Sequence, residues 1–130
     1  MSAVVVDASA FGALVFGEPR QDDIAKRLRN ATLHAPALVL FEVANIAVTK
    51  VRRRQLDRAR ALDALAAFSH IDIVIVHVPA EACAELALAT GLTAYDAAYL
   101  VVARHLGAPL VTLDVKLEKA AQALPSSGDK

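Results

Sequence analysis

The 130-residue sequence predicts a single α/β domain, a three-layer sandwich in which helices cover both faces of a mostly parallel sheet. The length allows one substantial hydrophobic core and is too short for two. Short runs rich in β-branched residues alternate with longer helical stretches along the chain. Residues 4–6 form a continuous apolar run, which is typical of a strand that is covered on both faces.

Four segments are expected to be strands: residues 4–6, 32–35, 71–78 and 110–113. The third has the clearest β-branched content, while Asp72 and His77 near its ends indicate exposure there. The fourth follows Gly107 and Pro109, which end the preceding helix.

Helices are expected at residues 7–16, 22–30, 36–53, 55–69 and 80–90, from residue 94 to the stop at Gly107, and at 114–124. Thr93 is placed to cap the sixth helix. The third is almost wholly apolar before Lys50, so we expect its middle to be buried. The domain is therefore assigned to residues 1–124, and residues 125–130 are expected to form a flexible C-terminal tail.

Composition limits the function and the location. Fourteen basic and fourteen acidic side chains give no net charge, so no global field attracts nucleic acid, although a local basic patch still can. The single Cys83 excludes an internal disulfide framework and fits a reducing compartment. No signal peptide is visible, and no uncharged run approaches the roughly 18 residues that a membrane-spanning helix needs. We expect a soluble, cytoplasmic protein without a membrane partner.

The chain is unusually apolar for a small monomer. Hydrophobic residues make up 56% of it, and its mean hydropathy is +0.44. A monomer of this size needs a largely polar surface to stay dispersed. We therefore expect another chain to cover part of the surface.

Four carboxylates stand in apolar surroundings, where an unpartnered charge is costly. Asp7 and Asp114 each follow an apolar strand, at the carboxyl ends where ligand groups gather in parallel sheets. Glu42 lies within an apolar helix, one turn from Asn45, and Asp96 lies in the first turn of another. The sequence therefore predicts that the four acids share a partner.

A divalent cation is the expected partner, because like charges in one pocket would otherwise force some acids to remain protonated. Carboxylate oxygens suit Mg²⁺ or Mn²⁺, and the set lacks the His and Cys ligands that zinc prefers. Phosphodiester hydrolysis is the natural chemistry of such a site. An alternative is that Asp7 and Asp114 are only helix caps, an interpretation that fits Glu42 and Asp96 poorly.

Four motifs carry a resemblance to a known family: Val-Val-Asp-Ala-Ser-Ala at 5–10, Phe-Glu-Val-Ala-Asn at 41–45, Tyr-Asp-Ala-Ala-Tyr at 95–99 and Leu-Val-Thr-Leu-Asp at 110–114. In this order they resemble the PIN-domain ribonucleases, and more narrowly the VapC toxins of toxin–antitoxin modules. The resemblance spans residues 4–124. It implies a PIN-like sheet of four strands, or of five where relatives add a final strand.

The resemblance also implies the roles of particular residues. An acidic quartet would surround one or two Mg²⁺ or Mn²⁺ ions: Asp7, Glu42, Asp96 and Asp114. Asp7 and Asp96 match the acids that most often touch the metal. Three further positions match residues that support the site by hydrogen bonding: Ser9, Asn45 and Thr112.

The implied activity is endoribonuclease cleavage of RNA by a toxin that a cognate antitoxin silences. We expect a homodimer, or a hetero-oligomer with the antitoxin. Our hypothesis is that the antitoxin lays an apolar helix beside the helix pair at 36–69 and directs a basic side chain toward the acids.

Other interpretations remain open at this point. A receiver-like phosphoacceptor domain also uses Mg²⁺ and acids at strand ends, but it needs a Lys that closes a later strand, and none is found. An inactive binding domain would keep the acids only as caps. The basic run 52–54 is either a solvated helix corner or an RNA-backbone contact. Tyr95 and Tyr99 are expected in the core or at a subunit interface.

Overall fold

The computed structural model describes residues 1–124 of the chain. The strands are β1 (Ser2–Val6), β2 (Ala31–Ala35), β3 (Ile73–Ile75) and β4 (Leu110–Val111). The helices are α1 (Ala8–Val15), α2 (Gln21–Leu28), α3 (Leu38–Arg52), α4 (Arg58–Ser69), α5 (Ala80–Thr90), α6 (Ala94–Leu106) and α7 (Val115–Ala123). The predicted tail at 125–130, and any fifth strand after residue 124, lie outside the described residues.

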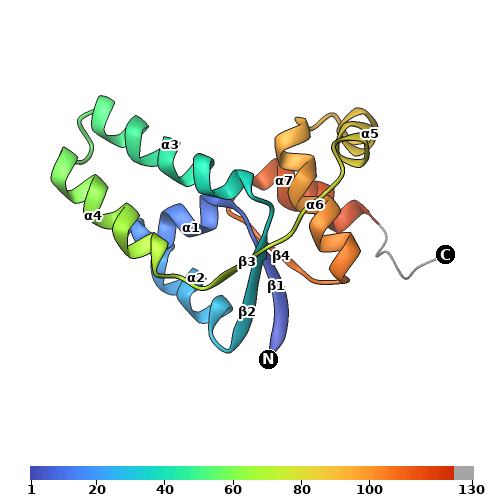
Figure 1. The fold of residues 1–130 in the computed structure, drawn as a ribbon, viewed down its shortest axis with the longest axis horizontal. Coiled ribbons are helices and arrows are strands. Elements are labelled where there is room, and N and C mark those ends of the chain that lie inside the picture. Colours follow the sequence, from blue (N-terminus) through green and yellow to red (C-terminus); the bar gives the residue numbers. More distant parts are fainter. Residues whose placement is uncertain (125–130) are drawn as a thin grey trace.

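The four strands form one sheet in the order β3-β2-β1-β4, and every neighbouring pair is parallel. Val5 of β1 lies opposite His34 on one side and Leu110 on the other. Figure 1 shows α1 to α4 on one side of the sheet and α5 to α7 on the other. The predicted three-layer α/β/α fold is confirmed.

The strand order places a crevice beside β1. From β1 the chain moves outward to β2 and β3 through α1 to α4, and then crosses to β4 on the opposite side of β1 through α5 and α6. The direction of the strand order therefore reverses at β1. In open parallel sheets, ligands bind outside the carboxyl ends of the strands at the point of such a reversal. Asp7 follows β1 and Asp114 lies three residues after β4, so the topology brings both acids to this crevice.

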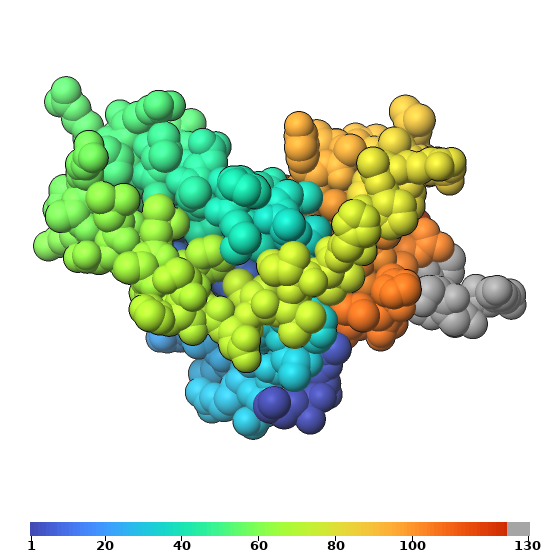
Figure 2. Space-filling model, viewed as in Figure 1, coloured from blue at the N-terminus to red at the C-terminus, as the bar shows by residue number. Residues whose placement is uncertain are grey.

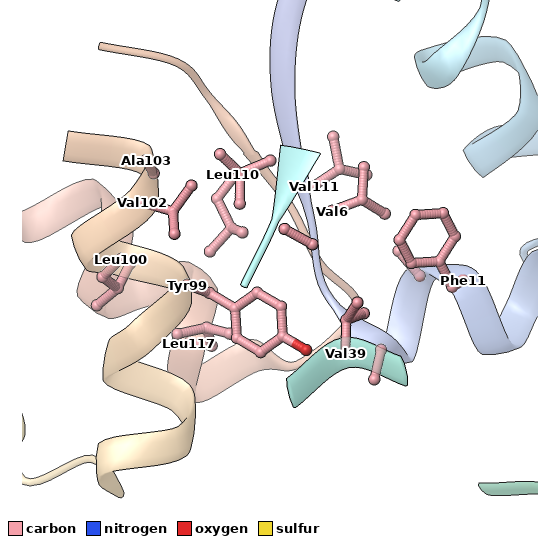
Figure 3. Close-up of a cluster of buried hydrophobic side chains, with 14 of the residues drawn as sticks. Val6, Phe11, Val39, Tyr99, Leu100, Val102, Ala103, Leu110, Val111 and Leu117 are labelled. Carbon is pink, nitrogen blue, oxygen red and sulfur yellow. The ribbon is translucent and has the colours of Figure 1, made fainter. Parts of the chain in front are cut away.

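The hydrophobic core joins both helix layers to the sheet. Figure 3 shows Val6 of β1 and Val111 of the neighbouring β4 between Phe11 of α1 and Tyr99 of α6. Gly12 lets α1 and α3 approach closely, because a Cβ built there would lie 3.1 Å from Ile46 Cδ1. This close packing fixes α3, and with it Glu42, against the start of α1.

Several elements are shorter than predicted. β3 covers only Ile73–Ile75 of the expected 71–78, because it is an edge strand that pairs only with β2, which ends at Ala35. β4 ends at Val111, where the chain turns toward α7. α4 begins at Arg58 rather than at residue 55, because the Asp57 carboxylate accepts a hydrogen bond from the Arg60 N–H and caps the helix there.

The prediction that the middle of the third helix is buried was wrong. Only one face of α3 packs inside the protein, and Leu40, Phe41 and Val48 are exposed on the other. The chain supplies α1 and α4 as neighbours of α3 and leaves its remaining face open. This is the kind of uncovered apolar surface that the composition predicted.

Within residues 1–124, no single helix is long and apolar enough to cross a membrane; the bent pair α5 and α6, which meet at 107°, passes the same test by length and composition alone.

Candidate functional site

A cleft of about 600 Å³ opens at the carboxyl edge of the sheet. In Figure 2 the surface is hollowed between α3 and the start of α6. The four predicted acids all line this cleft, together with two of the three predicted supporting residues: Asp7, Ser9, Glu42, Asn45, Asp96 and Asp114. Thr112 lies beneath the cleft and contacts Asp7.

Asp7 is the buried acid of the set, with only 4% of its surface exposed. Its Oδ1 accepts hydrogen bonds from Ser9 Oγ at 2.7 Å and from the Ala10 N–H at 3.0 Å, and its Oδ2 accepts one from Thr112 Oγ1 at 2.5 Å. Burial raises the pKa of Asp7 above its ordinary value, although the three donors oppose this shift. The three hydrogen bonds fix the orientation of the Asp7 carboxylate, and its burial means that a nearby positive charge would stabilise its ionised form.

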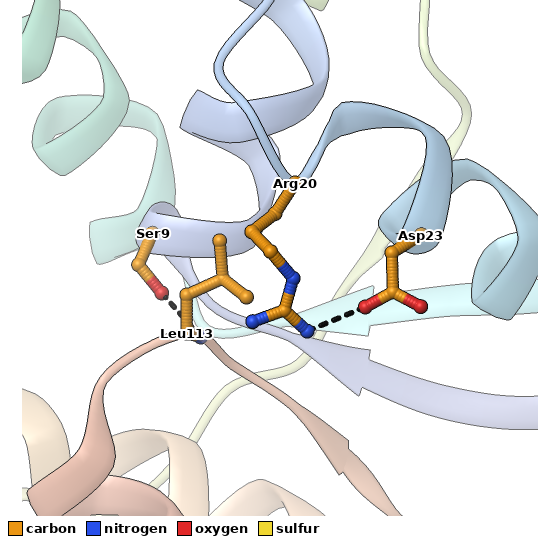
Figure 4. Close-up of polar contacts among 4 residues, drawn as sticks. All are labelled: Ser9, Arg20, Asp23 and Leu113. Atoms are coloured by element: carbon orange, nitrogen blue, oxygen red, sulfur yellow. Dashed lines mark hydrogen bonds and ion pairs between the residues drawn. The ribbon is translucent and has the colours of Figure 1, made fainter.

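Ser9 and Thr112 also fix the loop that carries Asp114. Ser9 Oγ accepts a hydrogen bond from the Leu113 N–H at 2.9 Å, as Figure 4 shows. Thr112 Oγ1 accepts one from the Asp114 N–H at 3.0 Å. These bonds tie the end of β1 to the end of β4. Asn45, by contrast, lies exposed in the cleft wall and makes no side-chain hydrogen bond to the acids within residues 1–124.

Glu42 is held by a residue that the sequence did not single out for the site. Tyr99, buried in the core as expected, donates its hydroxyl to Glu42 Oε1 at 2.6 Å. Partial burial raises the pKa of Glu42, and the charges of Asp96 and Asp7 add to the rise. Tyr99 lies three residues after Asp96, on a neighbouring position of the same helix, and this spacing was the available signal.

Asp96 and Asp114 are both placed by helix starts. Thr93 caps α6, as predicted, by accepting a hydrogen bond from the Asp96 N–H at 3.1 Å. Partial burial raises the pKa of Asp96, and the charge of Asp114 raises it further. Asp114 caps α7 by accepting from the Leu117 N–H at 3.0 Å. Asp7 and Asp114 are therefore helix caps, but both also line the cleft with two acids that cap nothing.

The donor set fits a hydrated, hard divalent cation. The acids interact electrostatically with one another, since Asp7, Glu42 and Asp96 each have a pKa raised partly by another member of the set. Within the described residues, no three or more His, Cys, Asp or Glu side chains lie close enough together to hold a metal ion by themselves. Mg²⁺ usually keeps several waters and takes only one or two carboxylates directly, so an open arrangement suits it.

Two aromatic side chains flank the acids at the surface. Phe41 and Tyr95 immediately precede Glu42 and Asp96, line the same cleft, and are 75% and 67% exposed. The expectation that Tyr95 packs in the core was wrong, and the alternative of a subunit interface stays a prediction. No Lys or Arg lines the cleft among the described residues.

The fold and the acidic cleft together define the class of protein. The sequence model of the PIN domain matches residues 4–123, nearly the whole described chain. This chain therefore belongs to the PIN-domain family.

Within that family the chain is of the VapC ribonuclease type. It is 37% identical to Ribonuclease VapC3 of Pyrobaculum aerophilum over 128 residues, covering 93% of this chain and 96% of that protein. It is 31% identical to Ribonuclease VapC12 of Mycobacterium tuberculosis over 119 residues, covering 90% of this chain and 91% of that protein.

Solved structures agree with the fold. The crystal structure of PAE2754 from Pyrobaculum aerophilum matches with a TM-score of 0.74 and 29% identity, over 93% of this chain and 81% of that chain. Mycobacterium tuberculosis VapC20, described as a sarcin-ricin loop cleaving toxin, matches with a TM-score of 0.66 and 22% identity, over 90% of this chain and 94% of that one.

Proposed function

We propose that this chain is a metal-dependent endoribonuclease, the toxin of a type II toxin–antitoxin system, which hydrolyses RNA phosphodiester bonds in the cytoplasm. The observation that carries the proposal is the arrival of four carboxylates, from distant parts of the chain, at one cleft at the strand-order reversal. The relatives named Ribonuclease VapC support the activity, and the family match favours it over the receiver-like alternative.

Asp7 and Asp96 would hold the Mg²⁺ or Mn²⁺ ion most directly, with Glu42 and Asp114 completing the acidic wall. When bound, such an ion supplies positive charge for the scissile phosphate and lowers the pKa of a bound water. The protein orients the acids in advance: three donors fix Asp7, and the Tyr99 hydroxyl fixes Glu42 Oε1. Glu42 Oε2 remains as the oxygen that can accept a proton, and its raised pKa suits that role.

The exposed rings of Phe41 and Tyr95 offer stacking surfaces for the bases next to the scissile phosphate. Stacking of a base on an aromatic side chain contributes about 1–3 kcal/mol and tolerates any base. Because no Lys or Arg of residues 1–124 lines the cleft, this contact would hold the substrate without adding charge.

A second groove is suited to the antitoxin. It measures about 350 Å³ and is lined mainly by apolar residues of α3, α4 and β3: Leu40, Ala44, Leu65, Phe68, Ser69, Ile71, Ile73 and Ile75. An amphipathic helix can bury its apolar face in such a groove. Leu40 and Glu42 are only two positions apart on α3, but their side chains point to different faces of the helix, so the groove and the acidic cleft lie on different sides of α3. A homodimer, or a hetero-oligomer with the antitoxin, would cover the remaining apolar surface.

Cleavage of RNA with and without Mn²⁺ tests the activity. The wild-type protein should cleave only with the metal, and Asp96→Asn should be inactive while keeping the cap on its own backbone N–H. Asp63→Asn is the matched control, because Asp63 is exposed on α4 and does not line the cleft. Metal-independent cleavage, or a fully active Asp96→Asn variant, would refute the proposal. A stable aspartyl-phosphate after treatment with a phosphodonor would favour the receiver-like alternative.

A further inference from the structure

Basic charge is concentrated at the corner between α3 and α4. Residues 50–60 contain six of the fourteen basic side chains of the chain and a single acid, Asp57. Two of the six are already paired: Lys50 with Glu18 at 3.1 Å, and Arg60 with Asp57 at 3.6 Å. The other four are exposed and make no ion pair within residues 1–124: Arg52, Arg53, Arg54 and Arg58. We call these four residues the arginine corner.

The backbone at Arg54 does not favour arginine. Its φ is +57°, in the left-handed region that suits glycine. The Arg54 N–H bonds to the Val51 carbonyl at 3.0 Å and the Gln55 N–H bonds to the Lys50 carbonyl at 2.8 Å, the pattern of a helix end at which glycine is the usual residue. The backbone conformation therefore favours glycine over arginine at this position.

Arg58 is also unfavourable where it stands. It is the first residue of α4, where the partial positive charge of the helix N-terminus repels a cation, and the first turn of α4 contains no acid. Helix-end electrostatics favour Arg52, in the last turn of α3, and Arg54, just past its C-terminal end, but not Arg58. Residues that oppose their local structure are expected where a function requires them.

The position of the corner relative to the cleft suggests that function. Glu42 and Arg52 lie on the same helix, ten residues apart, a separation of roughly 15 Å along the axis. Figure 1 shows the corner at the far end of α3, away from the sheet. The cleft wall itself is acidic and has no Lys or Arg within the described residues. An RNA whose scissile phosphate reaches the acids therefore needs its attractive charge contacts elsewhere.

We propose that the arginine corner binds the phosphate backbone of the RNA substrate at a distance from the scissile bond. This inference rests on the proposed ribonuclease function and adds a second contact region to it. The chain has no net charge, so the attraction comes from the separation of charge along α3, with acids at the cleft and guanidinium groups at the corner. Guanidinium groups suit phosphate because they can donate two hydrogen bonds to it at once.

Binding of RNA at different salt concentrations tests the proposal. The probe is a fluorescein-labelled single-stranded RNA of mixed sequence, and Asp96→Asn without divalent ions is the background, which prevents cleavage. Each phosphate contact to a single strand contributes about 0.7 to the slope of log affinity against log salt. Adding Arg52→Gln, Arg54→Gly and Arg58→Gln should reduce the magnitude of the slope by about 2 and weaken binding roughly a hundredfold at about 0.1 M salt.

Two variants separate charge loss from structural damage. Arg54→Gly alone should reduce the magnitude of the slope by about 0.7 while the melting temperature stays equal or rises, because glycine fits the left-handed backbone. The matched control removes three exposed charges at the C-terminal end of α2 and its cap with Lys26→Gln, Arg27→Gln and Arg29→Gln, and it should leave the slope unchanged. These residues precede β2 and so lie near the amino edge of the sheet, opposite the cleft.

A triple corner variant that binds RNA like the α2 control would overturn the proposal. Weaker binding of the co-encoded antitoxin with unchanged RNA affinity would also overturn it, and would assign the corner to a protein partner. Cleavage of the same RNA by the wild-type protein with Mn²⁺ is measured in parallel. Absence of cleavage would refute the ribonuclease function, and corner-dependent binding would then still support an RNA-binding surface.

Discussion

Replacement of Thr112 by valine should destabilise the protein through its effect on Asp7. Thr112 is 5% exposed, and its Oγ1 donates to Asp7 Oδ2 at 2.5 Å and accepts from the Asp114 N–H at 3.0 Å. Valine has a similar shape but can make neither bond. Loss of a hydrogen bond to a charged group costs about 1.5–3 kcal/mol, so we expect a loss of about 2 kcal/mol.

The assay is thermal and chemical unfolding in the presence of a metal chelator. One kcal/mol shifts the melting temperature of a domain of this size by roughly 4 °C, so Thr112→Val should melt roughly 8 °C lower. Thr112→Ser is the control, because it keeps the hydroxyl and loses one methyl group, at a cost of about 0.8 kcal/mol. The difference in melting temperature between the valine and serine variants should become smaller at acidic pH, where Asp7 is protonated. A valine variant as stable as the serine variant would refute the assigned role.

Three further predictions concern other parts of the site. Tyr99→Phe should lower the free energy of unfolding by about 1–2 kcal/mol and weaken Mn²⁺ binding, because Glu42 loses its hydrogen-bond donor. Chemical denaturation measures the first effect and titration calorimetry the second. Unchanged values of both would contradict the role of Tyr99 in orienting Glu42. Folding raises the pKa of Glu42, so above about pH 4 the folded state binds more protons than the unfolded state. The contribution of Glu42 to stability therefore falls as pH rises through its folded pKa. In guanidinium denaturation without metal, Glu42→Gln should therefore be more stable than the wild-type protein near neutral pH but not at low pH. An identical dependence of the unfolding free energy on pH in the two proteins would contradict this. Leu40→Glu should prevent co-purification of the antitoxin but leave RNA cleavage intact, and continued co-purification would exclude the second groove.

The sequence was sufficient to place Asp7 and Asp114, because each follows a strand whose apolar, β-branched pattern is local. The parallel sheet then puts both at one edge. From the residues alone, Glu42 and Asp96 were recognised as acids in apolar surroundings that share a partner, and the family resemblance assigned them to the acidic quartet. Their meeting with Asp7 depends on the packing of α3 and α6 on opposite faces of the sheet, which no local pattern encodes.

The family resemblance indicated Thr112 as a hydrogen-bonding residue of the site, but local patterns could not identify the partners of Thr112 or Tyr99, because these contacts join distant residues. Tyr99 and Glu42 are 57 positions apart, and Thr112 and Asp7 are 105 apart. Tyr99 lies in the core, one of the two locations expected for it, but the sequence could not identify the partner of its hydroxyl. The exposed face of α3 was missed for a related reason, since an apolar helix has the same sequence pattern whether its own chain or another chain covers it.

Calorimetric titration of Mn²⁺ into the chelator-treated protein tests most directly whether the four acids hold a divalent ion. We predict that the wild-type protein and the Asp63→Asn control bind Mn²⁺ with equal affinity. Asp7→Asn and Asp96→Asn should each bind on the order of tenfold or more weakly, a loss of about 1.4 kcal/mol or more. Absence of binding by the wild-type protein, or equal binding by all four proteins, would contradict the metal site on which the proposed ribonuclease function depends.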